Sequence, residues 1–326
     1  MQIFGSTSTY AESKLVYLPI PLEATASYGR GTSDTPASLA IPSLQVDLDD
    51  INFGNVRSIG MHTLLEDVLI KNANRTLIAG IDKLRHNPNL PEAKSQRDAI
   101  NDELEKIHER IYLTSAKLLD DGKYVGLIGG DHSCPFGLIK ALSERQSFGI
   151  LHIDAHFDLR DAFQGYRHSH GSIMYNVRQN CPGVSTITHV GIRDFCIEEK
   201  HFCEEHPSHQ VFYDWDLATA MAEGEAFASF SKRIVSSLPE RVYVSFDIDG
   251  LDPALCPGTG TPVGGGLSFH QMTYLLVNLL QAGKKIVGFD LCEVSNPTGT
   301  NEWNLNVGCR VLYKLSALLA RSQGLV

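Results

Sequence analysis

The stretch SFGILHIDAHFD, residues 147–158, decides how the fold is interpreted. It begins as an apolar, β-branched run and then places Asp154, His156 and Asp158 at every second position. Side chains two residues apart lie on the same face of a strand, so these three can converge where the strand ends. A buried strand that ends in two carboxylates and an imidazole predicts a metal-ligand site at its carboxyl end.

The same pattern of an apolar run followed by polar turn residues occurs four more times. The segments between these runs have helical character, which is typical of a parallel sheet with helices on its faces, so we predict an α/β fold. The four further runs are residues 123–133, 188–194, 241–253 and 284–297.

Three helices are predicted with defined ends. In residues 97–122 the apolar positions recur at helical spacing, and Gly122 ends the helix. A second helix begins at Ser268 as its cap and stops near Gly283, and a third covers residues 306–322. Residues 84–96 are interpreted as a loop-like insertion, and residues 1–326 as a single domain.

Composition excludes several classes of partner. The formal net charge is −10 and is spread along the chain, so neither nucleic acid nor an anionic membrane is indicated as a partner. We find no export signal and no apolar run long enough to cross a bilayer. Seven cysteines, odd in number and without a C-x-x-C pair, suit reduced thiols. We therefore expect a cytoplasmic protein.

Two other segments supply similar ligands. Asp247 and Asp249 follow the apolar run VYVSF, and His132 follows another run through two glycines. Ligands of parallel sheets collect outside the carboxyl ends of the strands, so we expect all these side chains at one site. Four aspartates and two histidines cannot stay together in a dry site without cations. Oxygen and nitrogen donors without thiolate favour two Mn²⁺, which can share a water and lower its pKa.

The three blocks GGDHS, DAHFD and SFDIDGLDP resemble the signatures of the ureohydrolase (arginase and agmatinase) superfamily, and the resemblance runs from about Pro21 to the final helix. It implies a three-layer α/β/α sandwich around a mainly parallel sheet, with two Mn²⁺ per chain. It also implies that both ions share Asp154 and Asp247 as bridging ligands. His132 and Asp158 would complete the coordination of the first ion, and His156 and Asp249 that of the second.

The resemblance also assigns catalytic roles. Asp158 would orient the attacking hydroxide, and Glu293 would pair with a guanidinium group of the substrate. His170 would carry a proton to the leaving amine, with His168 as the rival for that role. We expect Asp290 to be structural, His152 to support the ligands by packing or hydrogen bonding, and Asp252 to fix its loop.

The substrate is expected to be a small guanidino or amidine compound. The block DAHFDLRDAFQGYRHSHGS is most similar to agmatinases, which favours agmatine, converted to putrescine and urea. Formimidoylglutamase, arginase and other guanidine or guanidino-acid hydrolases stay open as alternatives. A zinc deacetylase-like enzyme or a non-catalytic binding protein is the alternative from another class. Relatives are commonly trimers or hexamers, so we expect a homo-oligomer.

Two further segments are interpreted as lacking a ligand site of their own. Residues 257–266 lack the spacing of a phosphate-binding loop and suit a wall beside the metals. Residues 196–210 hold two cysteines and three histidines whose spacing fits no familiar zinc pattern, so we predict a polar surface segment there.

Overall fold

The computed structural model describes residues 2–295 and 302–326; the end of the predicted run 284–297, from 296 on, lies outside the described residues. Eight strands form one sheet in which all neighbouring pairs are parallel, in the order β2-β1-β3-β8-β7-β4-β5-β6. The strands are β1 (Leu15–Pro19), β2 (Met61–Thr63), β3 (Tyr124–Ile128), β4 (Phe148–Ile153), β5 (Val184–Ile192), β6 (His209–Tyr213), β7 (Arg241–Phe246) and β8 (Lys285–Leu291).

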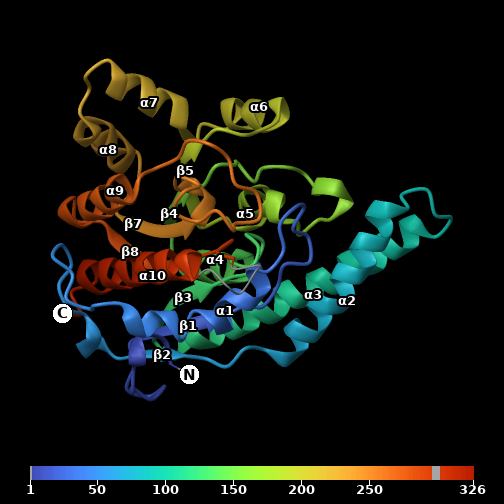
Figure 1. Cartoon of the computed structure of the whole chain (residues 1–326), viewed down its shortest axis with the longest axis horizontal. Coiled ribbons are helices and arrows are strands. Elements are labelled where there is room, and N and C mark those ends of the chain that lie inside the picture. The colour runs from blue at the N-terminus through green and yellow to red at the C-terminus, as the bar shows by residue number, and fades with distance from the viewer. Residues whose placement is uncertain (1, 296–301) are drawn as a thin grey trace.

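Helices cover both faces of the sheet, as Figure 1 shows. Buried side chains of α2 to α6 pack in one core cluster, and those of α7 to α10 in the other. The predicted α/β class and three-layer α/β/α arrangement are therefore confirmed. The helices are α1 (Thr35–Ser38), α2 (Val68–His86), α3 (Ala93–Asp120), α4 (Phe136–Ser143), α5 (Ile173–Asn180), α6 (Ile197–Glu205), α7 (Asp214–Ala222), α8 (Phe227–Ser236), α9 (Phe269–Gln281) and α10 (Trp303–Ser322).

The five predicted strand runs correspond to β3, β4, β5, β7 and β8. β1, β2 and β6 were not predicted, for local reasons. β1 is apolar and fully buried, but it ends in Pro19, a residue that argues against a strand inside a sheet. β2 has three residues and β6 begins with His209 and Gln210, so these two lack the long apolar run of a central strand. β2 and β6 lie at the two edges of the sheet, where such strands are tolerated.

The prediction of a loop at residues 84–96 is wrong at both ends. α2 continues to His86 and α3 already begins at Ala93, so the connection is residues 87–92. Leu84 and Ala93 are buried and extend the apolar stripes of the two helices. Pro88 and Pro91, which suggested a loop, are confined to the short connection.

The predicted helix stops at Gly122 and Gly283 and the predicted cap at Ser268 agree with the structure, whereas α3 and α10 begin before the predicted residues 97 and 306. Gly122 and Gly283 both have φ +71°, the left-handed conformation that ends helices. The Ser268 hydroxyl accepts a hydrogen bond of 3.2 Å from the backbone N–H of Gln271 at the start of α9. All seven cysteines are free thiols. Over the described ranges, no helix has the length and apolar character that a membrane span requires.

Candidate metal centre and substrate pocket

Four neighbouring strands place polar side chains at one edge of the sheet. His132 follows β3, Asp154 follows β4, Asp247 follows β7 and Glu293 follows β8. The two glycines before His132 allow a close approach of the chain, because a Cβ on Gly130 would lie 1.9 Å from the carbonyl oxygen of Leu22. The sheet order β3-β8-β7-β4 makes these strand ends adjacent.

The six predicted metal ligands come together, and we call them the acidic cluster: His132, Asp154, His156, Asp158, Asp247 and Asp249. His132 Nδ1 lies 2.9 Å from Asp154 Oδ2, 3.2 Å from Asp158 Oδ2 and 3.3 Å from Asp247 Oδ2. His156 Nδ1 lies 3.4 Å from Asp154 Oδ1 and 3.2 Å from Asp249 Oδ2. Asp154 therefore touches both imidazoles, which is the position of a bridging carboxylate.

The charges in the acidic cluster shift one another's pKa values. Burial alone would lower the pKa of His132, but Asp154, Asp158 and Asp247 outweigh it and raise that pKa well above its usual value. Burial also opposes protonation of His156, yet Asp249 and Asp154 raise its pKa to about 12. Burial, followed by repulsion from Asp154, raises the pKa of Asp158 to about 6. Buried carboxylates this close hold protons unless cations replace them.

Glu293 has an unused carboxylate oxygen at the pocket. Its Oε1 accepts a hydrogen bond of 3.0 Å from the backbone N–H of His132, while its buried Oε2 has no partner among the described residues. Gly260 lies so close that a Cβ there would be 3.1 Å from Oε2. Burial, then Asp247 and Asp131, raise the pKa of Glu293 well above its usual value. The unpaired oxygen is available to a donor from a ligand.

The structure separates the two loop histidines. His170 lines the pocket, and its Nε2 lies 3.2 Å from Ser27 Oγ. His168 instead contacts Glu105 on α3 at 2.9 Å and stacks on His108, away from the pocket lining. Burial, then the charge of His156, lower the pKa of His170 to about 3, so this imidazole is neutral. The geometry favours His170 over its rival.

Two residues of the N-terminal loop were missed from the sequence. Thr25 Oγ1 accepts a hydrogen bond of 3.0 Å from the backbone N–H of His170 and donates to Asp131 Oδ2 at 3.1 Å. Ser27 is the hydrogen-bond partner of the His170 ring. Hydroxyl residues are common in loops, so their residue types alone do not mark these two.

The outer wall of the pocket carries both signs of charge. Arg160, Asp194 and Glu199 line it together with Phe163 and Thr261. Arg160 lies 3.5 Å from Glu199 in an ion pair and 4.6 Å above the ring of Phe163. Thr261, from the predicted wall at 257–266, contacts Asp249 Oδ2 at 3.3 Å.

The supporting residues behave as expected. His152 Nε2 lies 2.9 Å from Asp154 Oδ2, behind the acidic cluster. Asp290 Oδ1 accepts a hydrogen bond of 3.1 Å from the backbone N–H of Phe246. Asp252 Oδ1 accepts one of 2.8 Å from the backbone N–H of Ala254 and so fixes its turn.

Comparison with known proteins identifies the family. A model of the Arginase family matches residues 13–317. The chain belongs to the arginase family. Among relatives, the N(1)-aminopropylagmatine ureohydrolase of Synechocystis is 29% identical over 320 residues, covering 97% of this chain and 92% of the relative. The agmatinase of Bacillus anthracis is 29% identical over 294 residues, covering 89% and 86% of the two chains. The protein is therefore an arginase-family ureohydrolase, a hydrolase of C–N bonds.

Solved structures of arginase-family proteins share the fold. The agmatine ureohydrolase of Thermoplasma volcanium superposes with a TM-score of 0.74 at 21% identity, covering 99% of this chain and 95% of that one. The proclavaminate amidino hydrolase of Streptomyces clavuligerus gives 0.75 at 21%, covering 98% and 97%. The family match favours a hydrolase over the deacetylase-like and binding-protein alternatives.

The prediction of a polar surface segment at residues 196–210 holds for most of its residues, because only Glu199, Cys203 and His209 are buried there. The segment forms α6 and β6, and Cys203 and His209 lie on their buried sides. Both lie beside His189 of β5, in a group of three that could hold a metal ion. The spacing of the residues gave no sign of this because His189 comes from a different strand.

Proposed function

We propose that the protein is a binuclear Mn²⁺-dependent hydrolase that converts agmatine to putrescine and urea. The observation that carries the proposal is the convergence of six imidazole and carboxylate side chains from three strand ends on one pocket. The set has oxygen and nitrogen donors and no sulfur, which suits Mn²⁺ better than a structural zinc.

The acidic cluster fits two ions. His132, Asp154, Asp158 and Asp247 would hold one, and Asp154, His156, Asp247 and Asp249 the other. Divalent ions held in this way lower the pKa of water and so supply hydroxide near neutral pH. The close carboxylates support this assignment, because their repulsion is relieved when cations replace the protons.

The pocket residues would position the substrate. The unpaired Oε2 of Glu293 would accept hydrogen bonds from the guanidinium group, for which a carboxylate is the natural planar partner. Asp158 would accept a hydrogen bond from the attacking water. Neutral His170 would carry a proton to the amine that leaves when the C–N bond breaks.

The substrate's other end would meet the outer wall. Asp194 there favours the ammonium tail of agmatine, whereas Glu199 is already paired with Arg160, the one guanidinium in the described lining. N(1)-Aminopropylagmatine, which a relative's name states, carries a longer cationic tail and is the second candidate. A guanidino acid would need Arg160 to leave Glu199.

Urea release tests the proposal. The Mn²⁺-loaded protein is assayed with agmatine, N(1)-aminopropylagmatine, arginine, guanidinobutyrate, guanidinopropionate and guanidine, and by ammonia or formamide release with formimidoylglutamate. We expect the highest kcat/KM with agmatine. A preference for a guanidino acid would overturn the proposed substrate. Inactivity on every compound with Mn²⁺, Ni²⁺, Co²⁺ or Fe²⁺ would overturn the proposed reaction.

A further inference from the structure

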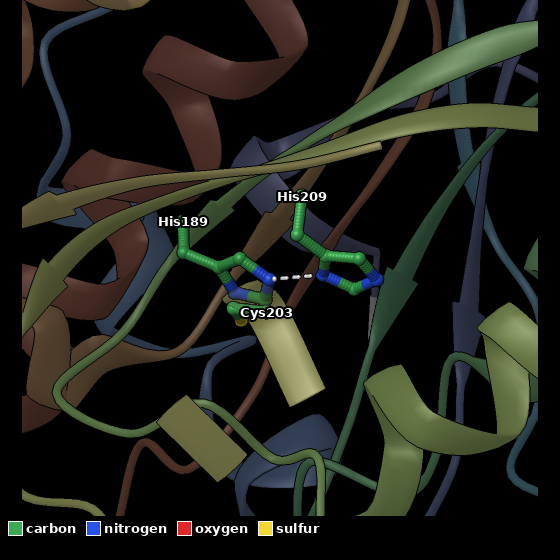
Figure 2. A group of neighbouring side chains, drawn as sticks. All are labelled: His189, Cys203 and His209. Atoms are coloured by element: carbon green, nitrogen blue, oxygen red, sulfur yellow. Dashed lines mark hydrogen bonds between the residues drawn. The ribbon is translucent and has the colours of Figure 1, made fainter. Parts of the chain in front are cut away.

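A second group of ligand side chains lies beside the sheet, away from the pocket. His189 comes from β5, Cys203 from α6 and His209 from β6, and Figure 2 shows them facing one another. One nitrogen of each imidazole and the Cys203 sulfur all lie within 4.8 Å of one another, and all three residues are buried. We call these three residues the thiol cluster. Its donors converge from three separate elements.

The register of the sheet explains this convergence. His152 of β4 pairs with His189 of β5, and Ile187 of β5 pairs with His209 of β6. Ile187 and His189 are two residues apart and so face the same side, the side on which Ile187 and Cys203 pack in one core cluster. His189 and His209 therefore meet beneath α6, whose buried side carries Cys203.

Burial shifts the pKa values of all three residues of the thiol cluster toward the uncharged forms. Burial, then the electrostatic effect of His152, hold the pKa of His189 well below its usual value. Burial lowers the pKa of His209 to about 3. Both imidazoles are thus neutral and keep a lone pair for a metal. Burial raises the pKa of the Cys203 thiol to about 12, so this thiol is no nucleophile by itself.

The polar groups of the thiol cluster are incompletely satisfied by the protein. Within residues 2–295 and 302–326, Cys203 is a free thiol, and the buried Nε2 of His209, the ring nitrogen that does not contact His189, has no hydrogen-bond partner. His189 Nε2 lies 2.9 Å from His209 Nδ1. This pair and the Cys203 sulfur are close enough together for one ion to reach all three residues.

We propose that His189, Cys203 and His209 form a third metal site, for a thiophilic ion such as Zn²⁺ or Cu⁺. The ligand atoms are His189 Nε2, His209 Nδ1 and Cys203 Sγ. Soft thiolate with imidazole selects these ions over Mn²⁺, which prefers oxygen. Binding displaces the thiol proton, and with Cu⁺ the two neutral imidazoles and one thiolate leave no net charge to bury.

The surroundings indicate a structural site. The ring of Phe157 lies edge-on to His189 at 5.3 Å, and that of Phe202 edge-on to His209 at 5.5 Å. Such walls restrict access of water and substrate, whereas a catalytic ion needs an open position. An ion here would tie α6 to β5 and β6 at the edge of the sheet.

Co²⁺ binding to the full-length protein tests the Zn²⁺ form. Sulfur ligation gives Co²⁺ a thiolate-to-metal charge-transfer band in the near ultraviolet, which the acidic cluster cannot give because it has no sulfur. We expect this band in the wild type, with about one Co²⁺ per chain beyond those bound by the acidic cluster. Cys203→Ser and His209→Gln should lose the band, and Cys181→Ser, which removes another buried thiol, should keep it.

A Cu⁺ arm distinguishes the second ion. Titration of the protein with Cu⁺ against a chromogenic chelator measures affinity, and X-ray absorption identifies sulfur and nitrogen neighbours. We expect Cys203→Ser to weaken Cu⁺ or Zn²⁺ binding at this site at least a hundredfold. Circular dichroism of the metal-free variants checks folding, and the nearly isosteric Cys203→Ser decides if His209→Gln does not fold. The proposal is overturned if wild type shows no sulfur ligation with either probe, or if Cys203→Ser keeps it.

Discussion

Both the acidic cluster and the thiol cluster contain histidines, but the pKa values of these histidines are shifted in opposite directions. His132 and His156 lie among carboxylates, which raise their pKa values, whereas His189 and His209 lie among thiol and aromatic groups, where burial lowers theirs. His152 joins the two clusters, with Nε2 2.9 Å from Asp154 Oδ2 and Nδ1 2.9 Å from His189 Nδ1. The neighbours of a histidine, more than the sheet that carries it, decide its charge and the metal it suits.

Asp154→Ala should cause the largest loss of activity. It disrupts the acidic cluster and leaves the three residues of the thiol cluster in place. Asp154 touches both His132 and His156, so its loss removes a ligand from both proposed ions. We expect kcat/KM for the best substrate to fall on the order of a thousandfold or more, at about 1.4 kcal/mol for each tenfold step. Asp252→Ala removes an aspartate that only fixes a turn and is the matched control. Near-normal activity of Asp154→Ala would contradict its role.

Glu293→Gln tests the pocket side of the acidic cluster without removing a proposed metal ligand. The amide keeps the shape of the side chain but loses the charge that would face the guanidinium group. We expect kcat/KM to fall about a hundredfold, because a charge-assisted pair to a buried group is lost. Metal content, measured on the same samples, should stay that of wild type. A loss of metal with the activity would place Glu293 among the ligands instead.

A pair of substitutions at His152 tests the connection between the clusters. Gln can place its amide N–H where Nε2 donates to Asp154, whereas Asn is too short and reaches only the Nδ1 position. We expect Mn²⁺ affinity to fall roughly 10- to 100-fold in His152→Asn, as for other residues that orient a ligand, and less in His152→Gln. Equal losses in both variants would show that packing alone matters.

The number of protons released on metal binding compares the two clusters directly, although the expected difference between them is small. A group whose pKa lies above the ambient pH in the metal-free protein must lose its proton to a metal, so affinity rises with pH. At pH 7 this applies to His132 and His156, and we expect about two or more protons released on loading the acidic cluster. The thiol cluster should release about one, from Cys203. Calorimetry in buffers of different ionisation enthalpy counts them, and equal counts would contradict the comparison.

Much of the acidic cluster could be predicted because its signals are local. Asp154, His156 and Asp158 alternate at the end of a single strand, and Asp247 and Asp249 repeat the pattern at another. Parallel strands bring their carboxyl ends together, so the site followed once the strands were found. Their charges and the unpaired oxygen of Glu293 could not be predicted, because burial and neighbours set them.

The thiol cluster and the contacts of the N-terminal loop could not be predicted from the sequence. His189, Cys203 and His209 match no ligand spacing, and β6, which carries His209, lacks an apolar run. Thr25 reaches Asp131 across 106 residues of chain, and nothing in either segment marks the contact. Such sites depend on which strands become neighbours, which only the assembled sheet determines.

Asp158 and Glu293 also adopt a backbone conformation that few residues other than glycine accept, with φ of +56° and +60°. Each such residue costs the fold about 1–3 kcal/mol. Laboratory evolution for heat resistance, with no demand for turnover, should therefore enrich Gly or Asn at both positions. The selected variants would be more stable to heat but less active, and their substitutions at positions 158 and 293 would show that stability and activity oppose each other there.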